Sequence, residues 1–145
     1  MKYLILIILF SLINGCSNDN GFKPAQINYG EDICTACSMI ISEQKYSAQY
    51  ILPDGTVKKF DDIGCMIDYI KKTKDEIDRI STIYVRDFES NNWINAKNAY
   101  FIYNRQIKTP MGYGIIAFAN DNEASNYMKD NGGKGVGSLL SLINR

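Results

Sequence analysis

Residues 46–70 read YSAQYILPDGTVKKFDDIGCMIDYI, and this stretch decides the fold class. Residues 46–52 alternate loosely between apolar and polar side chains, as a half-buried strand does. The next four residues, PDGT at 53–56, form a turn because proline presets φ and glycine accepts a positive φ. Residues 57–60 then return as the second strand. The stretch therefore predicts a β-hairpin.

An amphipathic helix follows the hairpin. Apolar residues recur at i, i+3, i+4 and i+7 from Ile63 to Ile70, which predicts a helix over residues 62–78. Asp61 or Asp62 can cap its N-terminus with a side-chain carboxylate. Further strands are expected at 80–88, 93–96, 99–103 and 115–118, and a second helix at 121–130, capped by Asn120 or Asp121. The glycine-rich residues 132–137 are interpreted as a flexible connector to a short terminal helix.

The chain contains a weak internal sequence repeat. Phe60-Asp61-Asp62 leads into a helix with Tyr69 nine residues after the Phe, and Phe118-Ala119-Asn120 leads into one with Tyr127 at the same offset. We therefore predict an α+β fold of two small ββα-type halves, about 30–79 and 80–145, packed as one compact body.

The N-terminus has the layout of a secretory signal. One lysine precedes an apolar run over residues 3–13, which is too short for a membrane span of roughly 20 residues. The run ends in Ile13-Asn14-Gly15-Cys16, which resembles a bacterial lipobox with Cys16 as the lipidated residue. We expect a signal peptide over 1–15, a lipid anchor at Cys16, a polar tether over 16–29 and a compact domain over 30–145. An ordinary cleaved signal that ends near a cysteine is the alternative.

Composition excludes several classes of function. The 16 basic and 16 acidic residues balance without a basic stripe, so nucleic acid is not an expected partner. The chain has no histidine, which excludes His-based acid–base catalysis, a Ser-His-Asp triad and His-containing zinc or copper sites. With Cys16 assigned to lipid, Cys34, Cys37 and Cys65 remain, and an odd number cannot form a closed disulfide framework.

The sulfur-rich stretch Cys34-Thr35-Ala36-Cys37-Ser38-Met39 is the candidate metal site. A redox pair would be expected at a helix N-terminus, whereas here a hairpin follows. A zinc site would need a second ligand pair, and only Cys65 is available. Thioether sulfur favours Cu(I), which accepts two or three sulfur ligands. Met39 therefore makes copper the preferred metal ion for this stretch. A plain disulfide between Cys34 and Cys37 stays open.

Met111, Cys65 and Met66 are the further sulfur residues to weigh as metal ligands. Met111 occupies a Pro- and Gly-bounded loop, residues 109–114, and is a candidate ligand from a second loop, although it could equally pack beneath that loop. Met66 belongs to the apolar stripe of the first helix. We interpret Cys65 and Met66 as structural, because free cysteines are commonly buried.

Together these motifs resemble the NosL family, the nitrous oxide reductase accessory lipoproteins. The matching pieces are the lipobox at Cys16, Glu31-Asp32-x-Cys34-x-x-Cys37-x-Met39-x-Ile41, Phe60-Asp61-Asp62-x-x-Cys65-Met66-x-x-Tyr69, Trp93-x-x-Ala96 and Thr109-Pro110-Met111-Gly112-x-Gly114-x-x-Ala117-Phe118. The resemblance implies a non-enzymatic, membrane-anchored Cu(I) chaperone on the extracytoplasmic, periplasmic side of a bacterial membrane. It would deliver copper to nitrous oxide reductase together with that enzyme's membrane maturation machinery.

The resemblance also implies a ligand set. The family's Cys-x-Met segment corresponds to Cys37 and Met39, and its Met-Gly loop to Met111. Ser38 replaces the usual glycine, and no histidine exists to complete the copper shell, so Cys34 or solvent could fill the gap. The main alternative function is a thiol–disulfide redox lipoprotein that uses Cys34 and Cys37. A third is a metal-free lipoprotein in which these two cysteines form a structural bridge.

Overall fold

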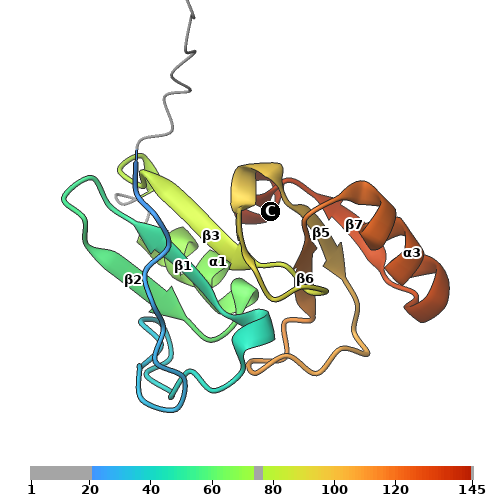
Figure 1. Cartoon of the computed structure of the whole chain (residues 1–145), viewed down its shortest axis with the longest axis horizontal. Helices are drawn as coiled ribbons and strands as arrows, with labels where there is room; N and C mark the ends of the chain where they lie inside the picture. Colours follow the sequence, from blue (N-terminus) through green and yellow to red (C-terminus); the bar gives the residue numbers. More distant parts are fainter. Residues whose placement is uncertain (1–20, 74–76, 145) are drawn as a thin grey trace, which may run out of the picture.

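The computed structural model describes residues 21–73 and 77–144, so the predicted signal peptide and Cys16 lie outside the described residues. Figure 1 shows two small sheets side by side with helices against them. The elements are the 3-10 turns η1 (Gln44–Tyr46) and η2 (Ala96–Asn98), the strands β1 (Ala48–Ile51), β2 (Val57–Phe60), β3 (Thr82–Arg86), β4 (Trp93–Asn95), β5 (Tyr100–Tyr103), β6 (Ile115–Phe118) and β7 (Lys134–Gly137), and the helices α1 (Ile63–Lys72), α3 (Asp121–Asn131) and α4 (Leu139–Ile143). Among the described helices, none combines the length and apolar composition that crossing a bilayer requires.

The two sheets share one topology. Their strand orders are β2-β1-β3-β4 and β6-β5-β7, and all neighbours within a sheet are antiparallel. In each sheet the first strand is central, its hairpin partner lies on one side, and the strand after the helix lies on the other. The α+β prediction is confirmed. Each unit is ββαβ, with β4 added to the edge of the first sheet, which thus extends past residue 79.

The internal sequence repeat corresponds to an aromatic contact that occurs in both units. The Phe60 and Tyr69 ring centroids are 5.6 Å apart, and those of Phe118 and Tyr127 are 5.4 Å apart. In each unit the last residue of the hairpin packs on the helix that follows. The helix caps also correspond: Asp62 accepts from Gly64 N at 2.7 Å and Asn120 accepts from Glu123 N at 2.9 Å, as Asx caps do.

The prediction of a flexible connector over 132–137 is wrong, because residues 134–137 form β7 and pair with β5. Glycine has low strand propensity and no side chain to pack, so the sequence pattern hides this strand. Its pairing rests on backbone hydrogen bonds and includes a register shift at Phe101/Ile102. β7 is the counterpart of β3, which the repeat predicts once both units are compared.

The predicted helix over 62–78 is too long. α1 ends at Lys72, and Thr73 closes it by donating from its backbone N at 3.0 Å and from Oγ1 at 2.8 Å to the Tyr69 carbonyl. The first of the two units therefore has a helix of 10 residues.

The two units share a hydrophobic core. The main cluster of buried side chains includes Tyr50, Phe60 and Met66 from the first unit and Phe101 and Val136 from the second. A smaller cluster fills the space beneath α3. Because the main cluster draws on both sheets, the halves form one body with a continuous core.

The segment expected to be a tether is bound to the first sheet from Phe22 onward. Tyr84 Oη donates to the Phe22 carbonyl at 2.7 Å, and the Gln49 amide makes two hydrogen bonds, of 2.9 and 3.0 Å, to the backbone of Ala25. Ile27 is buried in the main core. Residues 22–29 therefore belong to the folded body.

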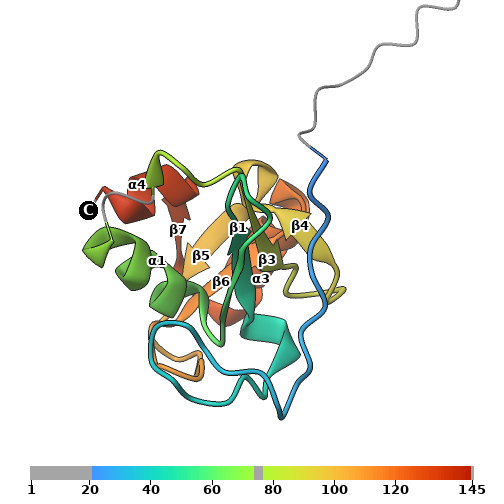
Figure 2. The same cartoon turned by 90° about the vertical axis from the view of Figure 1, so that its left-hand side faces the viewer.

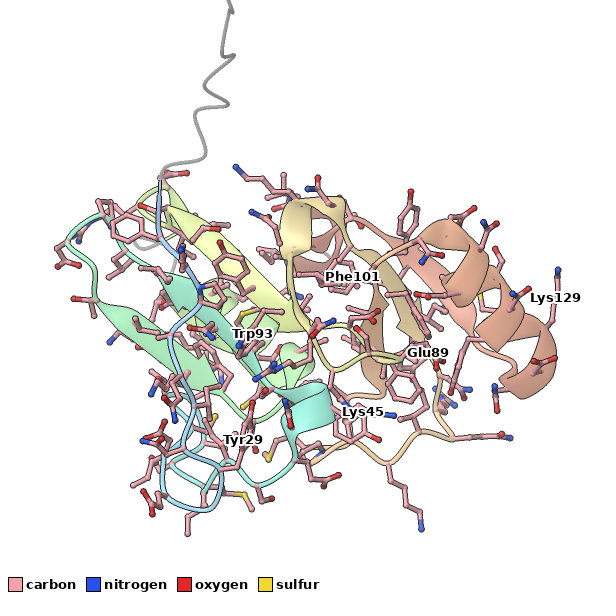
Figure 3. All side chains as sticks on the ribbon, in the orientation of Figure 1. Tyr29, Lys45, Glu89, Trp93, Phe101 and Lys129 are labelled. Atoms are coloured by element: carbon pink, nitrogen blue, oxygen red, sulfur yellow. The ribbon has the colours of Figure 1, made fainter. Side chains whose placement is uncertain are left out.

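Arg86, stacked on Trp93, holds the end of this segment by a hydrogen bond to Tyr29. The Arg86 guanidinium carbon lies 3.8 Å from the Trp93 ring centroid, and Nη2 donates to Tyr29 Oη at 2.9 Å. Figure 3 labels Tyr29 and Trp93 on the side of the molecule that carries the first sheet. The stacked guanidinium thus holds Tyr29 against the sheet, five residues before Cys34.

Asp87 links the two sheets. Its buried carboxylate accepts from Ala119 N at 2.8 Å, just past β6, and from the backbone N and hydroxyl of Ser90. Asp87 also forms a parallel bridge to Ala117. Burial raises the pKa of Asp87, but the hydrogen bonds from Ser90 and Ala119 outweigh it, so the pKa lies below its ordinary value of 3.8.

Asp87→Ala is expected to lower the free energy of unfolding by about 2–3 kcal/mol at neutral pH, because buried donors lose a charged acceptor. A lowered folded-state pKa contributes stability above the unfolded pKa, and this is lost as pH falls through the folded pKa. The difference from the parent chain should therefore shrink in acid. Urea unfolding at neutral pH and in acid measures this difference in unfolding free energy. Asp87→Asn is the control that keeps one acceptor oxygen. A pH-independent difference would contradict the assignment.

Candidate metal centre

Residues 32–41 form a small hairpin that carries Cys34 and Cys37. Ile41 N donates to the Asp32 carbonyl and Cys34 N to the Met39 carbonyl, both at 2.8 Å. Thr35 N donates to the Lys59 carbonyl at 2.8 Å, and Lys59 Nζ lies 2.6 Å from an Asp32 oxygen. These contacts fasten the hairpin to β2, so it lies over the start of α1.

Four candidate ligand atoms converge beneath this hairpin. The Sγ atoms of Cys34, Cys37 and Cys65 and one carboxylate oxygen of Asp61 all lie within 4.8 Å of one another. The Cys34 and Cys65 sulfurs are 3.7 Å apart, and the Cys37 thiol is 3.7 Å from both Asp61 oxygens. Cys34, Cys65 and Asp61 are buried, whereas Cys37 is half-buried. The cluster therefore has a closed floor and one accessible side.

Asp61 is not among the ligands predicted from the sequence, and Cys65 was predicted to be only a structural residue of the core. Cys65 is buried as expected, yet its sulfur lies within the cluster. Asp62 is the helix cap, which leaves Asp61 without that structural role. In the second unit the position that corresponds to Asp61 is Ala119, so the ββαβ unit does not need a carboxylate there. This contrast within the repeat was the available signal for Asp61.

The loop that carries Met111 is held against the start of α1. Met111 N donates to Asp62 Oδ2 at 3.1 Å, and Tyr113 Oη donates to Asp68. The Tyr113 ring lies directly over Gly64, where a side chain would overlap it. Because Asp62 both caps α1 and accepts from Met111, the helix start and the loop are coupled.

Met111 and two of the cysteines line one pocket. Its volume is about 160 Å³, and its lining is Ala36, Cys37, Cys65, Asp68, Tyr69, Lys72, Met111 and Tyr113. The structure thus brings Met111 to the accessible side of the cluster. Met39 is 53% exposed and is not among these lining residues. The structure therefore gathers Cys34, Cys37 and Met111 of the sequence-predicted residues, and leaves the Met39 side chain at the surface.

Burial controls the protonation of two thiols. It raises the pKa of Cys34 to about 11, and burial followed by the nearby Cys34 raises the pKa of Cys65 above its ordinary value. A reactive redox cysteine needs the opposite shift, so this geometry disfavours the thiol–disulfide alternative. The structure also has Cys34 and Cys37 as free thiols rather than a bridge. Metal binding would displace these protons, so affinity should rise with pH.

Ser38 occupies a backbone conformation that favours glycine, with φ at +62° between Cys37 and Met39. A left-handed conformation costs a non-glycine residue about 1–2 kcal/mol. Glycine would relieve this cost but adds about 0.5–1 kcal/mol of chain entropy on folding. Ser38→Gly is therefore expected to raise the free energy of unfolding by about 0.5–1 kcal/mol in denaturant unfolding. Asn91→Gly, at φ +59°, is the matched control with a smaller gain, because asparagine tolerates this region. A loss of stability in Ser38→Gly would contradict the strain.

Comparison with known proteins places the chain in a family. A sequence model of the NosL family matches residues 24–138, well over half of the chain. The crystal structure of the copper chaperone NosL from Shewanella denitrificans superposes with a TM-score of 0.69 at 22% identity, covering 78% of this chain and 91% of that one. A search of curated protein sequences finds no significant match. The chain therefore belongs to the NosL family.

Proposed function

We propose that this protein is a Cu(I)-binding chaperone and not an enzyme. It is anchored by acylated Cys16 to the extracytoplasmic face of a bacterial membrane. It passes copper to the maturing centres of nitrous oxide reductase through that enzyme's membrane machinery. The observation that carries the proposal is the convergence of three thiols and the Asp61 carboxylate beside Met111. Family membership supports the copper chaperone role.

The donor set suits a soft metal ion. Thiolate and thioether sulfur select Cu(I), which accepts two or three such ligands. Cys34 and Cys65 form the buried floor, and Cys65 also lines the pocket together with the more accessible Cys37 and Met111. A thiolate or imidazole of a recipient protein can therefore approach the ion from the Cys37 side. Ligand exchange there would release copper without unfolding the hairpin.

The surface around the site suits a protein partner. Of the six large apolar side chains exposed in the described residues, four belong to the two site loops: Ile33 at 60%, Ile40 at 56%, Met39 at 53% and Met111 at 38%. An apolar rim around an accessible ligand is typical of a docking site. A recipient that covers this rim would exclude water while the metal changes ligands.

Cu(I) titration of the reduced chain against a competing chelator tests the proposal. We expect about one Cu(I) per chain, with X-ray absorption showing two or three sulfur ligands. Three thiolates and a carboxylate would also satisfy tetrahedral Zn²⁺, so the zinc-loaded chain is the matched comparison. Cu(I) should displace the zinc. A reduced, folded chain that takes up no Cu(I), or that keeps zinc in its presence, would contradict a copper role.

Delivery is tested separately with copper-free nitrous oxide reductase. The copper-loaded chain should restore the enzyme's copper spectrum in the presence of its maturation machinery, whereas an equal amount of chelated copper should not. Equal recovery from both sources would contradict delivery and leave copper binding unaffected.

A further inference from the structure

The described chain begins at the end of the molecule opposite the metal-binding hairpin. Figures 1 and 2 both show the blue start of the described chain at the top and the hairpin of residues 32–41 at the bottom. The Tyr84 hydroxyl holds Phe22 by its carbonyl, so the chain is fixed to the first sheet from there on. Four residues, 17–20, separate Cys16 from Gly21. Even fully extended, they let Gly21 lie no more than about 18 Å from Cys16.

An apolar groove opens at this same end. It has a volume of about 240 Å³ and lies between the start of β3, η2 and α4, with Ile77, Ile80, Ile83, Leu139 and Ile143 among its lining residues. Leu140 stands at its rim and is 62% exposed, the most exposed large apolar side chain in the described residues. The exposed Lys97 also borders it. Figure 2 places α4 at the upper left and the blue start of the described chain at the upper right, so both lie at the upper end of the molecule.

We propose that this groove and Leu140, with Lys97, rest on the bilayer that holds Cys16, so that the metal site points away from the membrane. This inference rests on the lipid anchor of the proposed function. Leu140 enters the acyl region, and Lys97 lies among the phosphate headgroups, as lysines at membrane interfaces do. The short connection converts a weak surface contact into an intramolecular one, so a small apolar area is sufficient.

The geometry favours the bilayer over other occupants of the groove. Because residues 17–20 hold Gly21 within about 18 Å of the anchor, a folded partner would have to fit into that gap. The opposite end carries the metal hairpin and has no such restriction. The short connection over residues 17–20 therefore leaves the metal site accessible to proteins in the aqueous compartment.

Quenching by brominated lipid tests the orientation. The full-length lipidated chain is reconstituted into phosphatidylethanolamine–phosphatidylglycerol vesicles, with and without bromine on the acyl chains. Leu140→Trp reports on the groove, and Ile33→Trp, at a position of matched exposure (60% against 62%), reports on the metal hairpin. Emission of the native Trp93 in the unsubstituted chain is subtracted. The added emission of Leu140→Trp should be lost in brominated vesicles, and that of Ile33→Trp should be retained.

The outcomes separate this inference from the proposed function. If the chain floats with the vesicles but both tryptophans are quenched equally, or neither is, the orientation is overturned and the anchor stands. A chain that does not float overturns both the anchor and the orientation, while Cu(I) titration of that sample still reports on the chaperone role. Cross-linking of two chains through the Leu140 region without quenching would assign the groove to a second copy and overturn the inference.

Discussion

Cys65→Ser is expected to lower the Cu(I) affinity of this protein by about 100-fold or more, because loss of a group that merely orients a ligand already costs 10–100-fold. The Cys65 sulfur lies 3.7 Å from that of Cys34 and lines the pocket with Cys37 and Met111. A serine hydroxyl is a hard donor and a poor substitute for thiolate on Cu(I). Competition titration with a Cu(I) chelator measures the affinity, and thermal unfolding checks that the fold persists.

Three comparison variants define the ligand set. Cys37→Ser should lose at least as much affinity, because its thiol is the accessible member of the cluster. Met66→Leu changes the neighbouring residue of the same helix, whose side chain is fully buried in the core, and should leave affinity unchanged. Met39→Leu should have a smaller effect than Cys65→Ser. An unchanged affinity in Cys65→Ser with a large loss in Met39→Leu would instead support the set implied by sequence, Cys34, Cys37, Met39 and Met111.

Gly64→Ala is expected to lower the free energy of unfolding by about 3 kcal/mol, at the upper end of overpacking costs. A Cβ at residue 64 would overlap the Tyr113 ring, which carries the hydroxyl bound to Asp68. The loop must then move away from α1, and the Met111 contact to Asp62 moves with it. Urea unfolding measures the stability. A weaker Cu(I) affinity in the folded variant would show that the loop contributes to the site.

Gly135→Ala is the matched control for this change, since a Cβ there meets no atom within 4 Å. Its effect should stay within about 0.5 kcal/mol, as for surface positions. A double-mutant cycle with Tyr113→Ala tests the cause, because removing the ring should cancel most of the Gly64→Ala cost. Additive losses in that cycle would show that the strain lies elsewhere.

The predictable parts of the fold depend on neighbours in sequence. The hairpin at 46–60 follows from its turn residues, and α1 follows from the spacing of Ile63, Met66, Ile67 and Ile70. The sequence offered two candidate N-cap residues for each of α1 and α3. In the structure Asp62 caps α1 and Asn120 caps α3. Each feature is encoded within one or two turns of backbone, where local hydrogen bonds and side-chain periodicity decide the conformation.

β7 and the division between the sheets depend on distant partners. Lys134–Gly137 has little strand propensity, and β5, some 30 residues earlier, supplies its hydrogen bonds. β3 and β4 join the first sheet because β1 offers its free edge to β3. Strand pairing at such separations is set by the packing of whole units. Residue patterns alone therefore placed the boundary between the two halves at residue 79, before β3 and β4, which belong to the first sheet.

The sequence by itself determined that the chain carries soft sulfur donors without histidine, and that Cys34, Cys37 and Met39 lie on one short segment. Only the tertiary structure decided which donors meet. Two hydrogen bonds, from Thr35 N to the Lys59 carbonyl and from Lys59 N to Thr35 Oγ1, dock the hairpin on β2, and this brings Cys34 to Cys65, 31 residues away. Asp61 joins them because Asp62 takes the helix cap. Spacing fixes which atoms share a turn, whereas contact across the core requires the packed sheet and helix that hold both segments in place.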